Sequence, residues 1–209
     1  MNKGLKYILF SAIVVLVLYN SISIGKLSEL KAATNQSFDA AAYTKELWTK
    51  KIAGKIDSAI ELSTLISELA KDQPLALNKY TNSLGIGNYR YVFVKTQVKV
   101  IAVEEDEIKV QFKNGNSITD AIIATEYIYG NAVRDASFLV NVKDFSNTTD
   151  LNAISEEMNS IIRKEIIPGF KSSIKKGDSV NLVAAIELNK AFIKWEGLEL
   201  IPVHLEILP

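Results

Sequence analysis

A charge-free apolar run near the N-terminus most constrains this chain, because such a run does not belong on an ordinary water-exposed surface. Lys3 and Lys6 precede the run, which covers residues 7–25 and is closed by Lys26. As a helix, a run of this length would extend about 28 Å, close to the hydrocarbon thickness of a bilayer. We therefore predict a membrane anchor over residues 1–25, in which residues 7–25 cross the inner membrane.

The flanking lysines also predict an orientation. Positive charge ahead of a single span keeps the N-terminus in the cytoplasm. The chain is then a single-pass protein of the inner (plasma) membrane with a periplasmic or other extracytoplasmic domain. A cleaved signal peptide is an alternative, because Ser21-Ile22-Ser23 has the small-x-small pattern of a cleavage site. Either segment exports the domain, whereas a buried core helix, the third alternative, does not.

The rest of the chain predicts a short stalk and one globular domain. Residues 26–36 are small and polar, as in a stalk, and residues 37–209 have the usual size of one domain. Lysine plus arginine and aspartate plus glutamate each number 24, so the chain has no net charge to attract nucleic acid. We expect no nucleic-acid partner.

The counts of cysteine and histidine exclude several kinds of site. The sequence contains no cysteine, which excludes disulfides, thiolate metal sites, a cysteine nucleophile and a lipidated N-terminal cysteine. His204 is the single histidine, so a site built on two imidazoles is excluded as well. Its apolar neighbours Val203 and Leu205 indicate an ordinary strand residue. We expect no metal and no cofactor, and no catalytic residues can be identified.

Helical patterns dominate residues 39–84. Asp39 is a typical N-cap, and apolar residues then recur every three to five positions from Tyr43 to Leu69. This spacing predicts one long helix over residues 40–71, or two helices with a break near Gly54. Pro74 begins a further short helix.

Residues 89–209 change to the period of two that is typical of strands. Five strands are expected, at residues 91–103, 108–112, 118–129, 180–186 and 198–207. A helix between the third and fourth is capped by Thr149 or Asp150 and stopped by Pro168-Gly169. Pro202 lacks an N–H and therefore belongs at an edge or a bulge.

This order predicts an α+β domain. Five strands with a helix between strands 3 and 4 indicate an OB-like Greek-key barrel, preceded by the N-terminal helices and the transmembrane helix. An open α+β sheet remains the alternative, because alternation alone does not show that a sheet closes.

Several short motifs in order resemble a known family. They are Phe38-Asp39-Ala40-Ala41-Ala42-Tyr43, Gly130-Asn131-Ala132-Val133-Arg134-Asp135-Ala136, Asp144-Phe145-Ser146-Asn147, Lys176-Gly177-Asp178 and Ile201-Pro202-Val203. From about residue 37 to 208 the chain resembles the domain of unknown function 2291 family of predicted periplasmic lipoproteins. The resemblance implies an exported bacterial protein with no established activity, often encoded beside sugar-type ABC transporter components. No lipobox cysteine follows the apolar run here, which favours an uncleaved helix as the anchor.

The sharpest polar feature is Arg134-Asp135, for which two interpretations are open. A guanidinium pairs with carboxylates or hydroxyls in a fixed fork, so the two charges could form a ligand clamp. Asn131, Asp144 and Asn147 could join it. Alternatively, Arg134 and Asp135 form a structural ion pair, while Asp144 and Asn147 build a turn that caps the following helix.

Taken together, these patterns favour a non-catalytic binding or interaction module, accessory to a sugar-type ABC transporter or binding a small sugar-like ligand. Aromatic side chains could line a sugar-stacking groove or simply pack the core. They are Trp48, Tyr80, Tyr89, Tyr91, Tyr127, Tyr129 and Trp195. The alternative function is a cell-envelope enzyme acting on glycans through unidentified carboxylates, which would require two acids about 5–9.5 Å apart.

Overall fold

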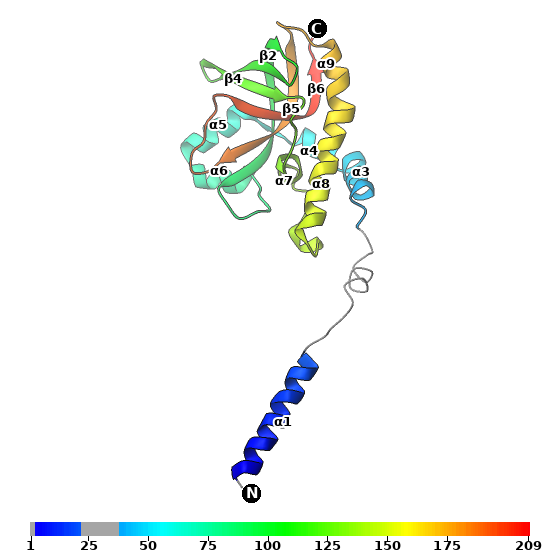
Figure 1. Ribbon diagram of the computed structural model, residues 1–209. Coiled ribbons are helices and arrows are strands. Elements are labelled where there is room, and N and C mark those ends of the chain that lie inside the picture. The colour runs from blue at the N-terminus through cyan, green and yellow to red at the C-terminus, as the bar shows by residue number, and fades with distance from the viewer. Residues whose placement is uncertain (1–2, 22–37) are drawn as a thin grey trace. The chain divides into compact units, whose positions relative to one another are not determined.

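The computed structural model describes residues 3–21 and 38–209 (Figure 1). The chain divides into two compact units, Met1–Phe38 and Asp39–Pro209. The predicted stalk at residues 26–36 and the last part of the predicted anchor, residues 22–25, lie outside the described residues.

The first unit contains one described helix, α1 (Lys3–Ser21). This helix begins earlier than the predicted span and includes both Lys3 and Lys6. Among the helices of the described residues, none is long and apolar enough to cross a membrane. The predicted transmembrane helix is therefore not confirmed.

The second unit is built on a sheet with the strand order β1-β2-β3-β4-β6-β5. Its strands are β1 (Ile60–Glu61), β2 (Tyr89–Val103), β3 (Glu107–Asn114), β4 (Ser117–Ala124), β5 (Ser179–Asn189) and β6 (Leu198–Ile207). Because β2 pairs with β5 as well as β3, the five long strands form a closed ring of pairings. The open-sheet alternative is therefore wrong, and the predicted order of five long strands is confirmed.

Alternation along each strand separates the inside of the ring from the outside. In β3 the side chains of Ile108, Val110 and Phe112 are buried, whereas Lys109 faces solvent. Inward residues of all five long strands form one cluster with residues of α5 and α6. Burial of apolar area in this cluster is the main stabilising contribution to the fold.

Two register shifts bend the ring. One lies between Val100 and Ala102 of β2 where it pairs with β3. The other lies where Val183 pairs with His204 but the next residue of β5, Ala184, pairs with Pro202. Since proline cannot donate to a ladder, its place beside this bulge confirms the prediction for Pro202.

In the second unit four described helices precede β2, and they correct the prediction of a long helix over residues 40–71. They are α3 (Ala40–Lys50), α4 (Ile52–Asp57), α5 (Leu62–Lys71) and α6 (Gln73–Tyr80). Asp39 caps α3 as predicted, accepting the Ala42 N–H at 2.9 Å. The breaks fall at Lys51 and in the segment before α5, not at Gly54. The second break arises because Ile60 and Glu61 leave the helix to pair in parallel with β2.

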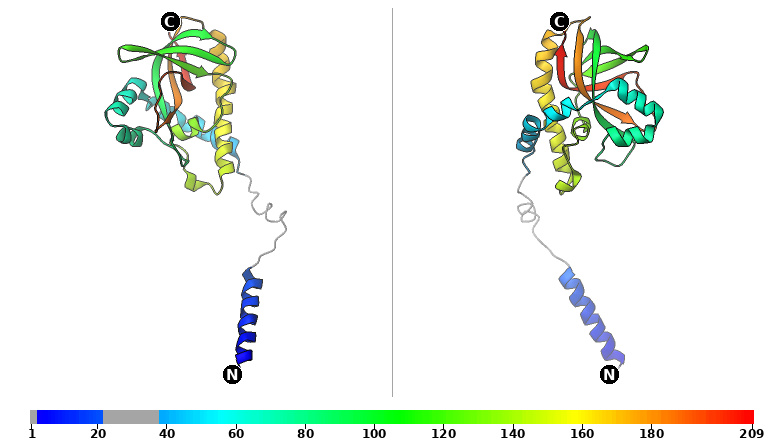
Figure 2. Two further views of the ribbon diagram at one scale, coloured as in Figure 1. Left: turned by 60° about the vertical axis from the view of Figure 1, so that its left-hand side comes forward. Right: turned by 180° about the vertical axis from the view of Figure 1, so that it is seen from behind.

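A helical segment connects β4 and β5. It comprises α7 (Ala132–Ala136), the 3₁₀ turn η1 (Val142–Asp144), α8 (Thr148–Ile161), the π-helical turn η2 (Ile162–Ile166) and α9 (Ile167–Ser173). In all views α8 and α9 run along one side of the sheet, and α5 and α6 lie on the opposite side (Figures 1 and 2). The predicted strand at residues 118–129 is too long, because β4 ends at Ala124 and a loop leads to α7.

Two details of the long helix differ from the prediction. Its N-cap is Asn147, which accepts the Asp150 N–H at 2.9 Å, and not Thr149 or Asp150. The helix also continues past Pro168-Gly169 to Ser173. The π turn η2 shifts the hydrogen-bond register, so Pro168 falls in the first turn of α9, where its missing N–H costs little.

Candidate functional site

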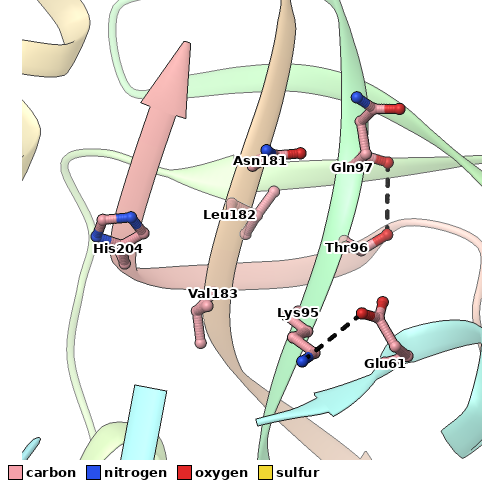
Figure 3. Close-up of a pocket in the computed structure, with 8 residues that line it drawn as sticks. All are labelled: Glu61, Lys95, Thr96, Gln97, Asn181, Leu182, Val183 and His204. Carbon is pink, nitrogen blue, oxygen red and sulfur yellow. Dashed lines mark hydrogen bonds and ion pairs between the residues drawn. The ribbon is translucent and has the colours of Figure 1, made fainter. Parts of the chain in front are cut away.

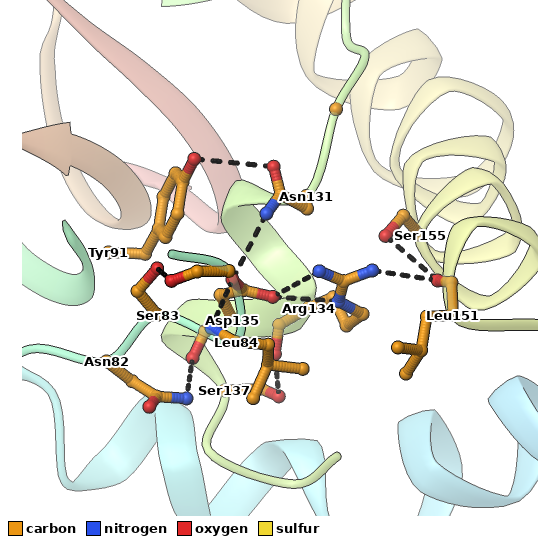
Figure 4. A network of polar contacts seen from close by, with 12 residues as sticks. Asn82, Ser83, Leu84, Tyr91, Asn131, Arg134, Asp135, Ser137, Leu151 and Ser155 are labelled. Atoms are coloured by element: carbon orange, nitrogen blue, oxygen red, sulfur yellow. Dashed lines mark hydrogen bonds and ion pairs between the residues drawn. The ribbon is translucent and has the colours of Figure 1, made fainter. Parts of the chain in front are cut away.

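The structure brings three of the five predicted site residues together on α7. Asn131 is the N-cap residue of this short helix, and Arg134 and Asp135 lie in its last turn (Figure 4). The two charges lie on a buried helix that packs against β2, β5 and α8.

Arg134 and Asp135 form a buried ion pair. The Arg134 Nη2 and Asp135 Oδ1 atoms are 2.7 Å apart, and the two side chains are only 6% and 0% exposed. Arg134 Nε donates to the same oxygen at 2.7 Å. Arg134 Nη1 donates to the carbonyl of Leu151 on α8 at 2.9 Å, so the pair also ties α7 to the long helix.

The other oxygen of Asp135 is also occupied. Oδ2 accepts the backbone N–H of Leu84 at 3.0 Å and Asn131 Nδ2 at 3.1 Å. The Asp135 carbonyl accepts Asn82 Nδ2 at 3.0 Å, so the carboxylate and its backbone hold the loop before β2 (Figure 4). Tyr91 OH donates to Asn131 Oδ1 at 3.3 Å. Burial, and then the charge of Glu187, raise the pKa of Tyr91, so this phenol stays protonated.

This geometry favours the structural interpretation of Arg134 and Asp135. Both side chains are satisfied by groups of the chain itself, and a ligand would have to displace these groups to reach the guanidinium. The ligand clamp stays a prediction, which the Arg134 variant described in the Discussion tests.

Asp144 and Asn147 lie apart from this network. Asp144 ends the exposed turn η1, and Asn147 caps α8, which is the capping role that the alternative interpretation gave it. Asp144 lies near Tyr43, whose pKa is raised by burial and then by this carboxylate. No described contact connects either residue with Arg134.

A hollow of about 460 Å³ lies on the outer face of the sheet (Figure 3). The register aligns Glu61, Lys95, Val183 and His204 in one row across β1, β2, β5 and β6. A neighbouring row aligns Gln97, Asn181 and Glu206 in the same way. We call these seven residues the outer polar face.

The outer polar face offers both hydrogen-bond donors and acceptors. The amides of Gln97 and Asn181 and the ring nitrogens of His204 can each donate or accept, depending on the tautomer of the histidine. Lys95 Nζ lies 3.8 Å from Glu61 Oε1, an ion pair at the rim of the hollow. His204 is a strand residue, as predicted, and also lines the hollow.

Sequence reasoning missed this face, although part of the signal was visible. Polar residues alternate with buried ones over residues 97–100 of β2 and 179–182 of β5, which marks one solvent-exposed side of this part of each strand. What alternation could not reveal is that β2 and β5 are neighbours, since that pairing is formed only when the ring closes.

Other candidate groups give no comparable site. Partial desolvation, and then the charges of Glu187 and Glu107, raise the pKa of Glu199, although this residue keeps part of its surface in contact with solvent. Within the described residues, no cluster of histidine, aspartate and glutamate could hold a metal ion. The predicted aromatic residues are dispersed: Tyr91 is buried, whereas Tyr127 and Tyr129 are exposed.

Comparison with known proteins identifies the fold and the family. A solved structure described as an OB-fold protein from Thermotoga maritima is similar over 82% of this chain and 99% of that chain, with 25% sequence identity and a TM-score of 0.71. This confirms the predicted OB-like fold of the second unit. No curated protein matches the chain.

The family comparison covers most of the sequence. A family described as "Predicted periplasmic lipoprotein (DUF2291)" matches residues 12–206. That description supports an extracytoplasmic, membrane-associated location, although this sequence has no cysteine to carry a lipid. The chain belongs to the DUF2291 family of predicted periplasmic lipoproteins.

Proposed function

We propose that this protein is an extracytoplasmic, non-catalytic binding module that takes a small, sugar-like ligand on the outer polar face. The observation that carries this proposal is the hollow of about 460 Å³ over neighbouring strands, with amide, imidazole and charged groups around it. Hydroxyl-rich ligands require such mixed donors and acceptors. The hydrogen-bonded ring holds these side chains on rigid strands, which lowers the entropic cost of binding.

The composition of the hollow favours binding over glycan hydrolysis. Glycosidases in general use two carboxyl groups on either side of the scissile bond. The outer polar face has two carboxylates among the described residues. Glu61 lines the hollow and is paired with Lys95. Glu206 does not line it and accepts a hydrogen bond from Asn181 Nδ2 at 3.4 Å. The proposal therefore assigns no catalytic step to this face.

The N-terminal segment would attach the module to the inner membrane, with components of a sugar-type ABC transporter as partners. The charge-free run at residues 7–25 and the lysines ahead of it support the membrane attachment. A reporter enzyme fused after Pro209 should be active only outside the cytoplasm and should sediment with membranes. A cytoplasmic reporter would contradict the proposal, and a reporter released into the periplasm would indicate that the segment is cleaved.

A thermal-shift screen of the full-length protein in neutral detergent tests the binding proposal. We expect one or more monosaccharides or nucleosides to raise the melting temperature. A ligand at about 100 times its Kd stabilises by about 2.7 kcal/mol, which corresponds to roughly 5–10 °C for a chain of this size. Asn181→Ala and His204→Ala should each reduce this shift by more than half.

Lys164→Ala is the control, because this exposed lysine on η2 lies outside the hollow. It should keep the full ligand-induced shift. Equal shifts in the wild type, the Asn181 variant and the His204 variant would show that the ligand binds elsewhere. If no sugar or nucleoside stabilises the protein, the sugar-like part of the proposal is wrong.

A further inference from the structure

A second hollow lies on another part of the domain and has a different character. Its volume is about 180 Å³, and it lies among α4, α6, the end of α7 and strand β2. Lys55, Lys79, Tyr80 and Phe138 line it, together with Ser58 and small or apolar residues. None of the described residues that line it is an aspartate or a glutamate. We call it the basic pocket.

Each lysine of the basic pocket lies over an aromatic ring. Lys55 Nζ is 5.7 Å from the centre of the Phe138 ring, and Lys79 Nζ is 4.8 Å from that of Tyr80. In the described chain no carboxylate forms an ion pair with either lysine. Glu68 acts on Lys79 electrostatically, but it forms its ion pair with Lys71, at 2.9 Å. The pocket therefore has two positive charges without a matching negative charge.

Phe138 has an unusual backbone conformation. Its φ angle is +55°, which makes it the one residue other than glycine with a positive φ in the described chain. Residues other than glycine, asparagine and aspartate rarely adopt this backbone region. Backbone strain of this kind is concentrated at functional sites such as ligand clamps. Phe138 is also 47% exposed, so burial of apolar surface does not account for the strain.

The buried network around Arg134 and Asp135 holds Phe138 in place. Phe138 donates its N–H to the Asp135 carbonyl at 3.3 Å. On both sides of it, Ser137 Oγ donates to the Arg134 carbonyl at 2.6 Å and accepts the Leu139 N–H at 3.1 Å. These bonds to the backbone carbonyls of Arg134 and Asp135 hold the turn at Phe138, whose side chain lines the basic pocket.

We propose that the basic pocket binds the phosphate group of a small phosphate monoester. A phosphate monoester has a charge of about −1.5 to −2 near neutral pH, which matches the two lysines. Lysine serves as a point-charge partner for phosphate. The rings of Tyr80 and Phe138 contact the organic part of the ligand, and Ser58 can donate a hydroxyl hydrogen bond. The Arg134–Asp135 motif has a positioning role here and does not touch the ligand.

Isothermal titration of the full-length protein in neutral detergent tests the proposal. The probe is phenyl phosphate, and the uncharged comparison compound is benzyl alcohol. We expect phenyl phosphate to bind and benzyl alcohol to bind at least tenfold more weakly. Lys55→Met/Lys79→Met should weaken phenyl phosphate binding at least tenfold. Lys45→Met/Lys164→Met removes the same charge from exposed positions outside the pocket and should leave binding unchanged.

The phosphate group could belong to a soluble ester or to a lipid headgroup. Dihexanoyl phosphatidic acid, kept below its micelle concentration, separates these sources. If only phenyl phosphate binds, the ligand is a soluble ester, and if only the lipid binds, it is a headgroup. In either case binding must depend on Lys55 and Lys79. Failure of both probes to bind, or equal binding by the two double variants, would overturn the proposal.

Phe138→Gly separates a binding role from a structural one. Glycine adopts a positive φ without strain, so the variant should melt at a higher temperature than the wild type. It should also bind phenyl phosphate several-fold more weakly, because it lacks the ring. A higher melting temperature with unchanged binding would show that the ring takes no part in the site.

Discussion

Arg134→Ala is expected to lower the free energy of unfolding by about 3–5 kcal/mol, because it leaves the carboxylate of Asp135 buried without its cation. The Asp135 side chain is 0% exposed, so water cannot replace the guanidinium without opening the domain. For a protein of this size the melting temperature should fall by roughly 10 °C. Urea or thermal unfolding of the full-length protein, followed by circular dichroism, measures the effect.

Two further variants sharpen this test. Arg134→Met/Asp135→Leu removes both charges together and should recover part of the lost stability, since no unpaired buried charge remains. Lys50→Ala breaks the Lys50–Glu46 pair, whose side chains are 68% and 60% exposed, and should change the melting temperature by no more than about 2 °C. If Arg134→Ala keeps the stability but abolishes ligand binding, Arg134 is a ligand clamp after all.

Leu65→Ala is expected to lower the free energy of unfolding by about 2–5 kcal/mol, through lost burial and the cavity that the smaller side chain leaves. Leu65 of α5 is 0% exposed and belongs to the same apolar cluster as the inward residues of the ring. The variant therefore tests whether α5 is part of the domain core or a separate attachment. Chemical denaturation with a single cooperative transition is the suitable measurement.

Leu75→Ala is the matched control, because this leucine of the neighbouring helix α6 is 62% exposed. It should change the free energy of unfolding by less than about 0.5 kcal/mol. If Leu65→Ala is equally mild, or if α5 unfolds in a separate earlier transition, the helices before β2 do not share the core of the ring.

The order of the strands along the chain could be predicted from the sequence, because the alternation of buried and exposed residues is a local property. The buried and exposed residues of β3 follow a period of two, and neighbouring turn residues mark where it ends. Strand β1 could not be predicted in this way. Ile60 fits the spacing of a helix, and it is in a strand only because Val94, more than thirty positions later, supplies its partner.

The candidate sites show the same limit. Adjacent opposite charges at Arg134 and Asp135 were visible, but their burial depends on partners from distant segments, the Leu84 N–H and the Leu151 carbonyl. The outer polar face and the basic pocket both combine residues of several elements. Neither site has a local motif, so the tertiary structure was needed to find them.

Closure of the ring also sets a condition on how this chain can fold. Tyr89 at the start of β2 pairs with Asn189 at the end of β5, 100 positions later in the sequence. Contacts between such distant positions slow folding, because a long loop must lose its entropy before the pairing stabilises it. If the domain crosses the membrane with its N-terminal end leading, β2 emerges with an unpaired edge and keeps it until β5 arrives. During this interval the nascent domain is open to mispairing with other chains.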